Sequence, residues 1–278
     1  MASTKNIKLL DRRLIVMGVG HNKSGKTVGL CTMPGKGKIY NFDGPGRMQP
    51  IAHMWPELDI EYENVGPKEI DSPDEDKRVM SFIQFCKEFE NLQDNCPYDW
   101  IGIDSFTSFT MTAVNFQLFT RMGGDWTLAK MKKTKGGLPI ASWDEFNGEA
   151  SMFGMIMDVA KVLPCSVWMT AHPLVKSETN TAGELVRRYV TLASFGMKVN
   201  QMAPGYFTEI WRFEREVNTD PNGPPINYTV YTQPSSGEGV GEFGSTALPL
   251  PISIDITNKK LFTEINNHLH MESRVQRI

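Results

Sequence analysis

The sequence predicts an α/β protein whose sheet is mostly parallel and doubly wound, with antiparallel strands at its C-terminal edge. Apolar, strand-like runs alternate with helical patterns between residues 13 and 172, which is typical of parallel strands joined by crossover helices. Two later strand-like segments, 206–216 and 226–234, have no helix between them, which is typical of antiparallel neighbours. No linker is rich enough in proline or serine to separate two domains, so we expect a single domain over residues 1–278.

Three buried strands are expected in the first part of the chain. The first is the apolar run "RLIVMGVG" (13–20), which ends in a glycine turn, and Pro34 and Gly35 end the helix expected after it. Ser72 and Pro73 give the pattern of a helix start, a capping serine followed by proline at the first helical position. The expected elements are strands at 13–20, 38–43 and 99–105, a short strand within the otherwise loop-like 50–72, and helices at 27–33, from 72 onwards and up to about 122.

The second part opens with a basic, glycine-flanked segment, 123–139, that is expected to be a loop. Ser142 and Glu145 form a capping box, which predicts a helix to about residue 163. The segments expected after this helix are a strand at 165–172, a long polar stretch at 173–205, the two neighbouring strands named above, a glycine-rich loop at 235–246 and a last helix at 261–270.

The stretch "GHNKSGKT", residues 20–27, matches the phosphate-loop pattern G-x-x-x-x-G-K-[ST]. Glycines let several backbone N–H groups face one point, and the positive end of the following helix adds to the attraction for phosphate. Lys26 is placed to reach the β- and γ-phosphates, and the Thr27 hydroxyl is placed to bind Mg²⁺. The alternative is an ordinary strand–turn–helix with a solvated lysine. The expected nucleotide-binding set is Gly20, His21, Asn22, Lys23, Ser24, Gly25, Lys26 and Thr27.

Three more polar residues stand at the ends of expected strands. Asp104 in "WIGIDS" is placed to organise Mg²⁺ beside the phosphate loop, or else to cap the next helix. Asp43 in "IYNFDGP" is placed to orient or deprotonate a water, or else to form an Asp-Gly turn. His172 in "MTAH" is placed to bond the γ-phosphate or the water, or else simply to complete a strand end.

Together "GHNKSGKT", "IYNFD", "WIGIDS" and "SVWMTAH" resemble the ordered core of RecA-like ATPases, and in particular the small phage-encoded RecA-like proteins of single-strand annealing and recombination. The resemblance covers about residues 13–265. It implies a RecA-like P-loop core, ATP with Mg²⁺, and single-stranded DNA bound to loops after the Asp104 and His172 strands. It also implies a homo-oligomer, a ring or a filament, in which a cation of one subunit reaches the ATP of its neighbour.

One position departs from the family pattern. A glutamate is usual two residues after the aspartate matched to Asp43, and here Pro45 stands there. Either Asp43 does the work on the water, or hydrolysis is slow, or the base lies elsewhere. Arg212 and Arg215 lie where the trans-acting cation is expected, and we take Arg215 as the candidate; the alternative is an ordinary charged strand face.

Contact with DNA is expected from two basic segments, one within the loop 123–139 and one within the polar stretch 173–205. Lysines with a nearby aromatic residue, Trp126, supply the phosphate neutralisation and base stacking that single strands require. The alternative is that both segments are solvated loops, since the formal net charge of the chain is −3. The candidate DNA-binding residues are Lys130, Lys132, Lys133, Lys135, Arg187 and Arg188.

The expected function is ATP binding and hydrolysis coupled to single-stranded DNA in recombination, annealing or replication. The alternatives are a P-loop motor or kinase of another class, and an ATP-gated scaffold that does not hydrolyse. No run approaches the roughly 20 apolar residues of a membrane helix, and the four cysteines form no C-x-x-C pair. We therefore expect no membrane partner and a cytoplasmic location, in the host cytoplasm if the protein is phage-encoded.

Overall fold

The computed structural model describes residues 13–44, 49–65, 75–121, 143–194, 196–233, 244–245 and 248–275. Its main sheet has nine strands: β1 (Ile15–Gly20), β2 (Gly37–Asn41), β3 (Ile60–Asn64), β4 (Trp100–Asp104), β5 (Ser166–Ala171), β8 (Glu209–Val217), β9 (Ile226–Tyr231), β10 (Gly244–Ser245) and β11 (Ser253–Asp255). A separate two-stranded hairpin consists of β6 (Pro173–Thr179) and β7 (Leu185–Leu192). The helices are α1 (Lys26–Cys31), α2 (Gln49–Met54), α3 (Glu75–Asn91), α4 (Phe106–Arg121), α6 (Trp143–Val162), α7 (Met197–Met202), the 3₁₀ helix η3 (Ala203–Tyr206) and α8 (Leu261–Val275).

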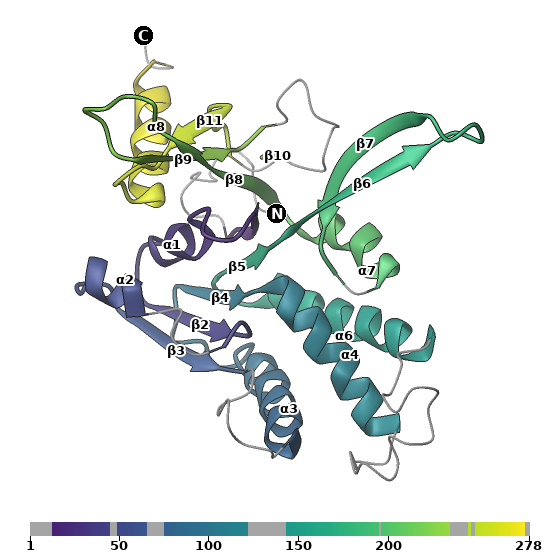
Figure 1. Ribbon diagram of the computed structural model, residues 1–278. Coiled ribbons are helices and arrows are strands. Elements are labelled where there is room, and N and C mark those ends of the chain that lie inside the picture. Colours follow the sequence, from purple (N-terminus) through teal and green to yellow (C-terminus); the bar gives the residue numbers. More distant parts are fainter. Residues whose placement is uncertain are drawn as a thin grey trace.

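The strand order is β11-β9-β8-β1-β5-β4-β2-β3, with β10 paired to β8 (Figure 1). Every pair from β8 to β3 is parallel, and β9, β10 and β11 pair antiparallel. This confirms the predicted fold class, including the antiparallel strands at the C-terminal edge. The strand order is consistent with a RecA-like core.

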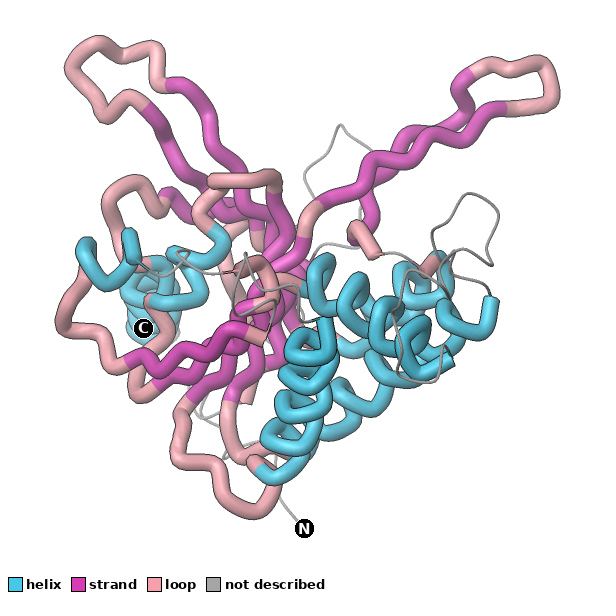
Figure 2. The backbone as a smooth tube through the Cα atoms, turned by 60° about the horizontal axis from the view of Figure 1, so that its bottom comes forward, coloured by secondary structure: helices cyan, strands magenta, loops and turns pink. Residues whose placement is uncertain are grey.

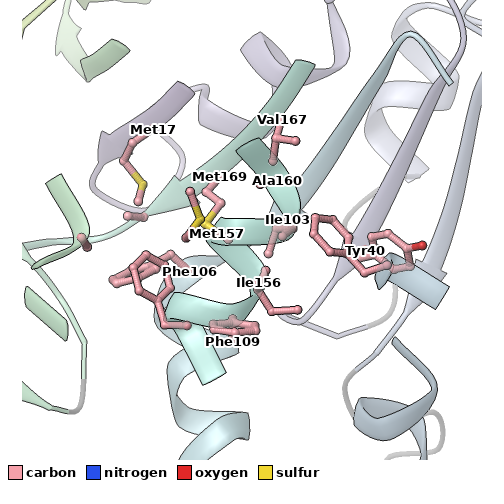
Figure 3. Close-up of a cluster of buried hydrophobic side chains, with 14 of the residues drawn as sticks. Met17, Tyr40, Ile103, Phe106, Phe109, Ile156, Met157, Ala160, Val167 and Met169 are labelled. Carbon is pink, nitrogen blue, oxygen red and sulfur yellow. The ribbon is translucent and has the colours of Figure 1, made fainter. Parts of the chain in front are cut away.

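Alternate residues of the central strands serve two separate cores, because successive side chains of a strand point to opposite faces. On one face Met17, Val167 and Met169 pack against α3, α4, α6 and α7 (Figure 3). On the other face Val16 and Trp168 pack with residues of α1, α2 and α8. Figure 1 shows these helices as two layers with the sheet between them. The sheet is therefore covered on both faces, as parallel strands require.

Two segments differ from what the sequence predicted. Residues 173–205, expected as a polar stretch, contain the β6–β7 hairpin and α7, and the loop-like 50–72 contains most of α2. Figures 1 and 2 show the hairpin standing out from the body of the molecule. Leu174, Val175, Leu185 and Val186 of the hairpin are exposed, so its sequence lacks the alternation of a half-buried strand.

Several sequence predictions fall outside the described residues. These are the basic loop 123–139, the cap at Ser142, the helix start at Ser72 and Pro73, and the position of Pro45. Among the helices that the structure does describe, none combines the length and apolar character needed to cross a bilayer.

Candidate nucleotide-binding site

The loop between β1 and α1 curls around the ammonium group of Lys26. Gly25 has φ 93° and Lys23 has φ 64°, left-handed conformations that turn the chain sharply before the helix. Lys26 is only 7% exposed, and its Nζ donates hydrogen bonds to the carbonyls of Gly20 at 2.7 Å and His21 at 2.9 Å. The loop and its lysine therefore form one closed unit at the carboxyl end of the central strand.

Ser24 gives an independent sign that this loop is built for a ligand. Its side chain is 2% exposed, yet its hydroxyl has no hydrogen-bond partner among the described residues, and it lines the adjoining pocket. A buried hydroxyl without a partner is costly unless something supplies one. An oxygen-rich ligand such as phosphate would do so.

Asp104, at the end of β4, is held by hydroxyl groups from two neighbouring elements. Thr27 Oγ1 of α1 donates to Asp104 Oδ2 at 2.8 Å, and Thr170 Oγ1 of β5 donates to Oδ1. Asp104 is 3% exposed and Thr170 is fully buried. This joins the two residues predicted to bind a metal, and Thr170 holds the second oxygen of the same carboxylate.

Asp43, just beyond β2, receives hydroxyl groups from the start of α4. Ser105 Oγ donates to Asp43 Oδ1 at 2.7 Å, and Ser108 Oγ donates to the same oxygen at 2.5 Å. The backbone N–H of Asp43 also donates to Asn41 Oδ1 at 3.1 Å. The carboxylate is thus fixed to the strand that carries Asp104, through contacts that no local sequence pattern indicates.

His172 follows β5 and lies at the root of the β6–β7 hairpin. The backbone N–H of His172 donates to Thr107 Oγ1 of α4 at 3.3 Å. Its backbone carbonyl accepts from the N–H of Ala193, just after β7, at 2.8 Å. His172 lines the same pocket as the two aspartates. It therefore connects the pocket to the hairpin.

A pocket of about 370 Å³ brings these residues together. Its lining includes Asp43, Asp104, His172 and the loop residues from Lys23 to Thr27. Apolar and aromatic side chains that were not predicted from the sequence also line it. They are Ile51, Met54 and Trp55 from α2 and its C-terminal end, and Tyr228 and Ile256 from β9 and the segment after β11, where Asn258 and Lys259 add polar groups.

The oxygen atoms of the Thr27 hydroxyl and the Asp104 carboxylate suit Mg²⁺. Mg²⁺ prefers oxygen ligands and usually takes only one or two from the protein, with phosphate and water oxygens completing its shell. The Thr27 hydroxyl and the Asp104 carboxylate are such a pair. Within the described residues no group of three or more His, Cys, Asp or Glu side chains is arranged to hold a metal ion.

The remaining predicted site residues lie elsewhere. His21 and Asn22 are exposed at the outer side of the loop and do not line the pocket. Arg215 is exposed on β8 opposite Tyr228, which lines the pocket, but Arg215 itself is not among the lining residues. Arg212, on the same strand, forms a salt bridge from its Nε to Glu214 Oε1 at 3.1 Å, and its guanidinium carbon lies 4.7 Å from the centre of the Tyr231 ring. These contacts match the alternative given above, an ordinary charged strand face.

Of the predicted DNA-binding residues, Arg187 and Arg188 lie on β7 opposite Glu178 and Ser177 of β6. The four lysines are outside the described part of the chain: Lys130, Lys132, Lys133 and Lys135.

No protein-family model and no curated protein sequence matches the chain. Among solved structures, 165 chains match. One of them is the KaiC-like protein PH0186 from the archaeon Pyrococcus horikoshii OT3, with 9% sequence identity and a TM-score of 0.40 over 78% of this chain and 77% of that chain.

Proposed function

We propose that the protein binds ATP with Mg²⁺ and hydrolyses it. The observation that supports this best is the composition of one pocket. A phosphate loop with a buried lysine, a hydroxyl–carboxylate pair suited to Mg²⁺ and a second carboxylate all line it. Trp55 and Tyr228 in the same lining offer aromatic surface to a nucleotide base.

Each residue then has a chemical task. Lys26 exchanges its carbonyl partners for β- and γ-phosphate oxygens, and Ser24 gains a partner for its hydroxyl. Thr27 and Asp104 would hold the Mg²⁺, which when bound neutralises charge on the phosphates. His172 is placed to contact the γ-phosphate.

Asp43 is placed to orient the attacking water and accept its proton. The water oxygen bonds to the γ-phosphorus while the bond from that phosphorus to the β–γ bridging oxygen breaks. ADP and inorganic phosphate leave, and the proton passes from Asp43 to solvent.

Coupling to single-stranded DNA is the finer part of the proposal. The β6–β7 hairpin begins at the residue after His172, and its second strand carries Arg187 and Arg188. A strand pair rooted at the nucleotide pocket is a direct way for ATP to change the placement of a DNA-binding surface. We propose in addition that the active form is a homo-oligomer, with the exposed Arg215 facing the nucleotide of a neighbouring subunit.

Lys26→Ala tests the nucleotide site. We expect ATP turnover to fall by about 10²–10³-fold, because the variant loses the charge that stabilises the transferred phosphoryl group. Turnover is measured with and without a single-stranded oligonucleotide, and Lys161→Ala, at an exposed lysine on α6, is the matched control.

Three outcomes separate the candidate functions. Stimulation by the oligonucleotide that disappears in Lys26→Ala supports the full proposal. Turnover indifferent to the oligonucleotide removes the DNA role and favours a P-loop enzyme of another class. ATP binding by the wild-type protein without turnover favours the non-hydrolysing scaffold.

A further inference from the structure

Asp43 carries the hydrolytic step in the proposed function, but it comes from a turn beyond the end of its strand. The buried Asn41 holds the backbone of this turn, because its Nδ2 donates to the Gly44 carbonyl at 2.5 Å and its Oδ1 accepts from the Asp43 N–H at 3.1 Å, but neither contact fixes the side-chain torsion of Asp43. A residue that orients a water must be held within a few tenths of an ångström of its working position. Something other than the turn alone must therefore define where the Asp43 carboxylate lies.

Two hydroxyl groups of the α4 N-terminus supply that constraint. Ser105 Oγ and Ser108 Oγ both donate to Asp43 Oδ1, at 2.7 Å and 2.5 Å. The two serine hydroxyl oxygens lie 3.3 Å apart, so both approach the same carboxylate oxygen from one side. Two donors on one oxygen restrict both the rotation and the tilt of the carboxylate.

The serines are themselves anchored to the strand that ends at Asp104. Ser105 follows Asp104 directly, is 1% exposed, and its Oγ accepts a hydrogen bond from the Ser108 N–H at 3.3 Å as the cap of α4. The backbone N–H of Phe42, next to Asp43, donates to the carbonyl of Asp104 at 2.6 Å. The positions of the two carboxylates are thus linked through one short segment of chain.

We propose that Ser105 and Ser108 are positioning residues for ATP hydrolysis. They hold the Asp43 carboxylate in a fixed position relative to Asp104 and the phosphate loop. This inference rests on the proposed function. Two serine hydroxyls then fix the position of the Asp43 carboxylate, which orients the water. The chain has Pro45 where the family pattern has a glutamate.

Ser108→Ala is the sharper probe, because Ser105→Ala would also remove a helix cap. We expect Ser108→Ala to lower kcat by about 10- to 100-fold with little change in KM, since the group that it misplaces acts on the water and not on nucleotide binding. Ser108→Thr retains a hydroxyl and is expected to recover most of the rate. Thr112→Ala is the matched control, because its hydroxyl bonds the Ser108 carbonyl one turn further along α4.

Two further measurements separate positioning from a general structural role. In an Asp43→Asn background, Ser108→Ala is expected to cause no additional loss, because its effect passes through Asp43. The affinity for ADP with aluminium fluoride, an analogue of the transferred phosphoryl group, is expected to fall in Ser108→Ala, while the affinity for a non-hydrolysable ATP analogue is unchanged.

The inference is overturned if Ser108→Ala keeps the wild-type kcat and the wild-type affinity for the aluminium fluoride complex. An equal further loss in the Asp43→Asn background also overturns it. In both cases wild-type turnover and the loss in Lys26→Ala stand, so the proposed function survives. A wild-type protein without ATP turnover removes the proposed hydrolysis and this inference together.

Discussion

At Gly20 the phosphate loop leaves β1 so close to β8 that a side chain has no room. A Cβ built there would lie 2.5 Å from the Phe213 carbonyl oxygen and 2.4 Å from Ser24 Oγ. The first contact is with backbone, which cannot move aside as the end of a flexible side chain can. The glycine is therefore required by packing between two strands as well as by the turn of the loop.

Gly20→Ala is expected to destabilise the folded protein by about 1–3 kcal/mol, the usual range for forcing extra volume into a packed site. The free energy of unfolding is measured by denaturant titration. Gly205→Ala, in η3, is the matched control, because a Cβ there meets nothing within 4 Å. Equal stability of Gly20→Ala and the control would contradict the packing seen around the loop.

Some contacts of single residues could be predicted from the sequence and others could not. Lys26 and Thr27 belong to a motif of fixed spacing, and Asp104 ends an apolar run, so a local pattern points to each. Trp55 and Ser108 carry no such pattern, because their place at the pocket depends on how α2 and α4 pack in three dimensions. Which side chains donate hydrogen bonds to a carboxylate depends on the tertiary structure and cannot be seen in the local sequence.

Among the elements, the β6–β7 hairpin is the one with the least support from the rest of the fold. Both of its strands pair only with each other, and it stands away from the sheet in Figure 2. An element that buries little surface contributes little to the stability of the core, so it can be changed with small effects on folding. This makes it suitable for testing a binding role.

Replacing Arg187 and Arg188 together by alanine is expected to weaken single-stranded DNA binding without changing basal ATP turnover. Each lost phosphate contact should lower the slope of log affinity against log salt concentration by about 0.7. Binding is measured by fluorescence anisotropy over a salt series. The control pair Lys36→Ala and Lys161→Ala removes two cations elsewhere on the surface, and an equal change in both pairs would count against the hairpin.

The strands of the main sheet were the elements that the sequence predicted best. Apolar runs such as 13–20 and 99–105 are long enough to identify a buried strand without tertiary information. The hairpin and α2 were missed for the opposite reason. The apolar residues Leu174, Val175, Leu185 and Val186 of the hairpin are exposed, and α2 has only six residues, which is too short to establish a helical period.

Over the whole molecule, the two cores on either side of the sheet also protect the thiol groups. Burial raises the pKa of Cys31 and Cys165 well above the usual range, and it raises the pKa of Cys86 to about 11. A raised pKa means less thiolate at a given pH, and the thiolate is the reactive form. These three thiols should therefore report on global unfolding.

At pH 8 the folded protein is expected to react with a thiol reagent much more slowly than the unfolded protein. For Cys86 the difference in thiolate is about a hundredfold, as follows from two pKa units. A Cys96→Ser variant removes the fourth thiol, which like Cys86 is partly exposed, from the measurement. Rates that are equal with and without denaturant would show that the cores open locally without unfolding.

The order of the strands also has a consequence for how the chain acquires its structure. β1, which carries the phosphate loop, pairs with β5 and β8, so that Val16 lies opposite Trp168 on one side and Glu209 on the other. These contacts join parts of the chain that are far apart, and such contacts form slowly. During synthesis β1 must wait for both partners to leave the ribosome. The motif that the sequence reveals first is therefore among the last to reach its working shape.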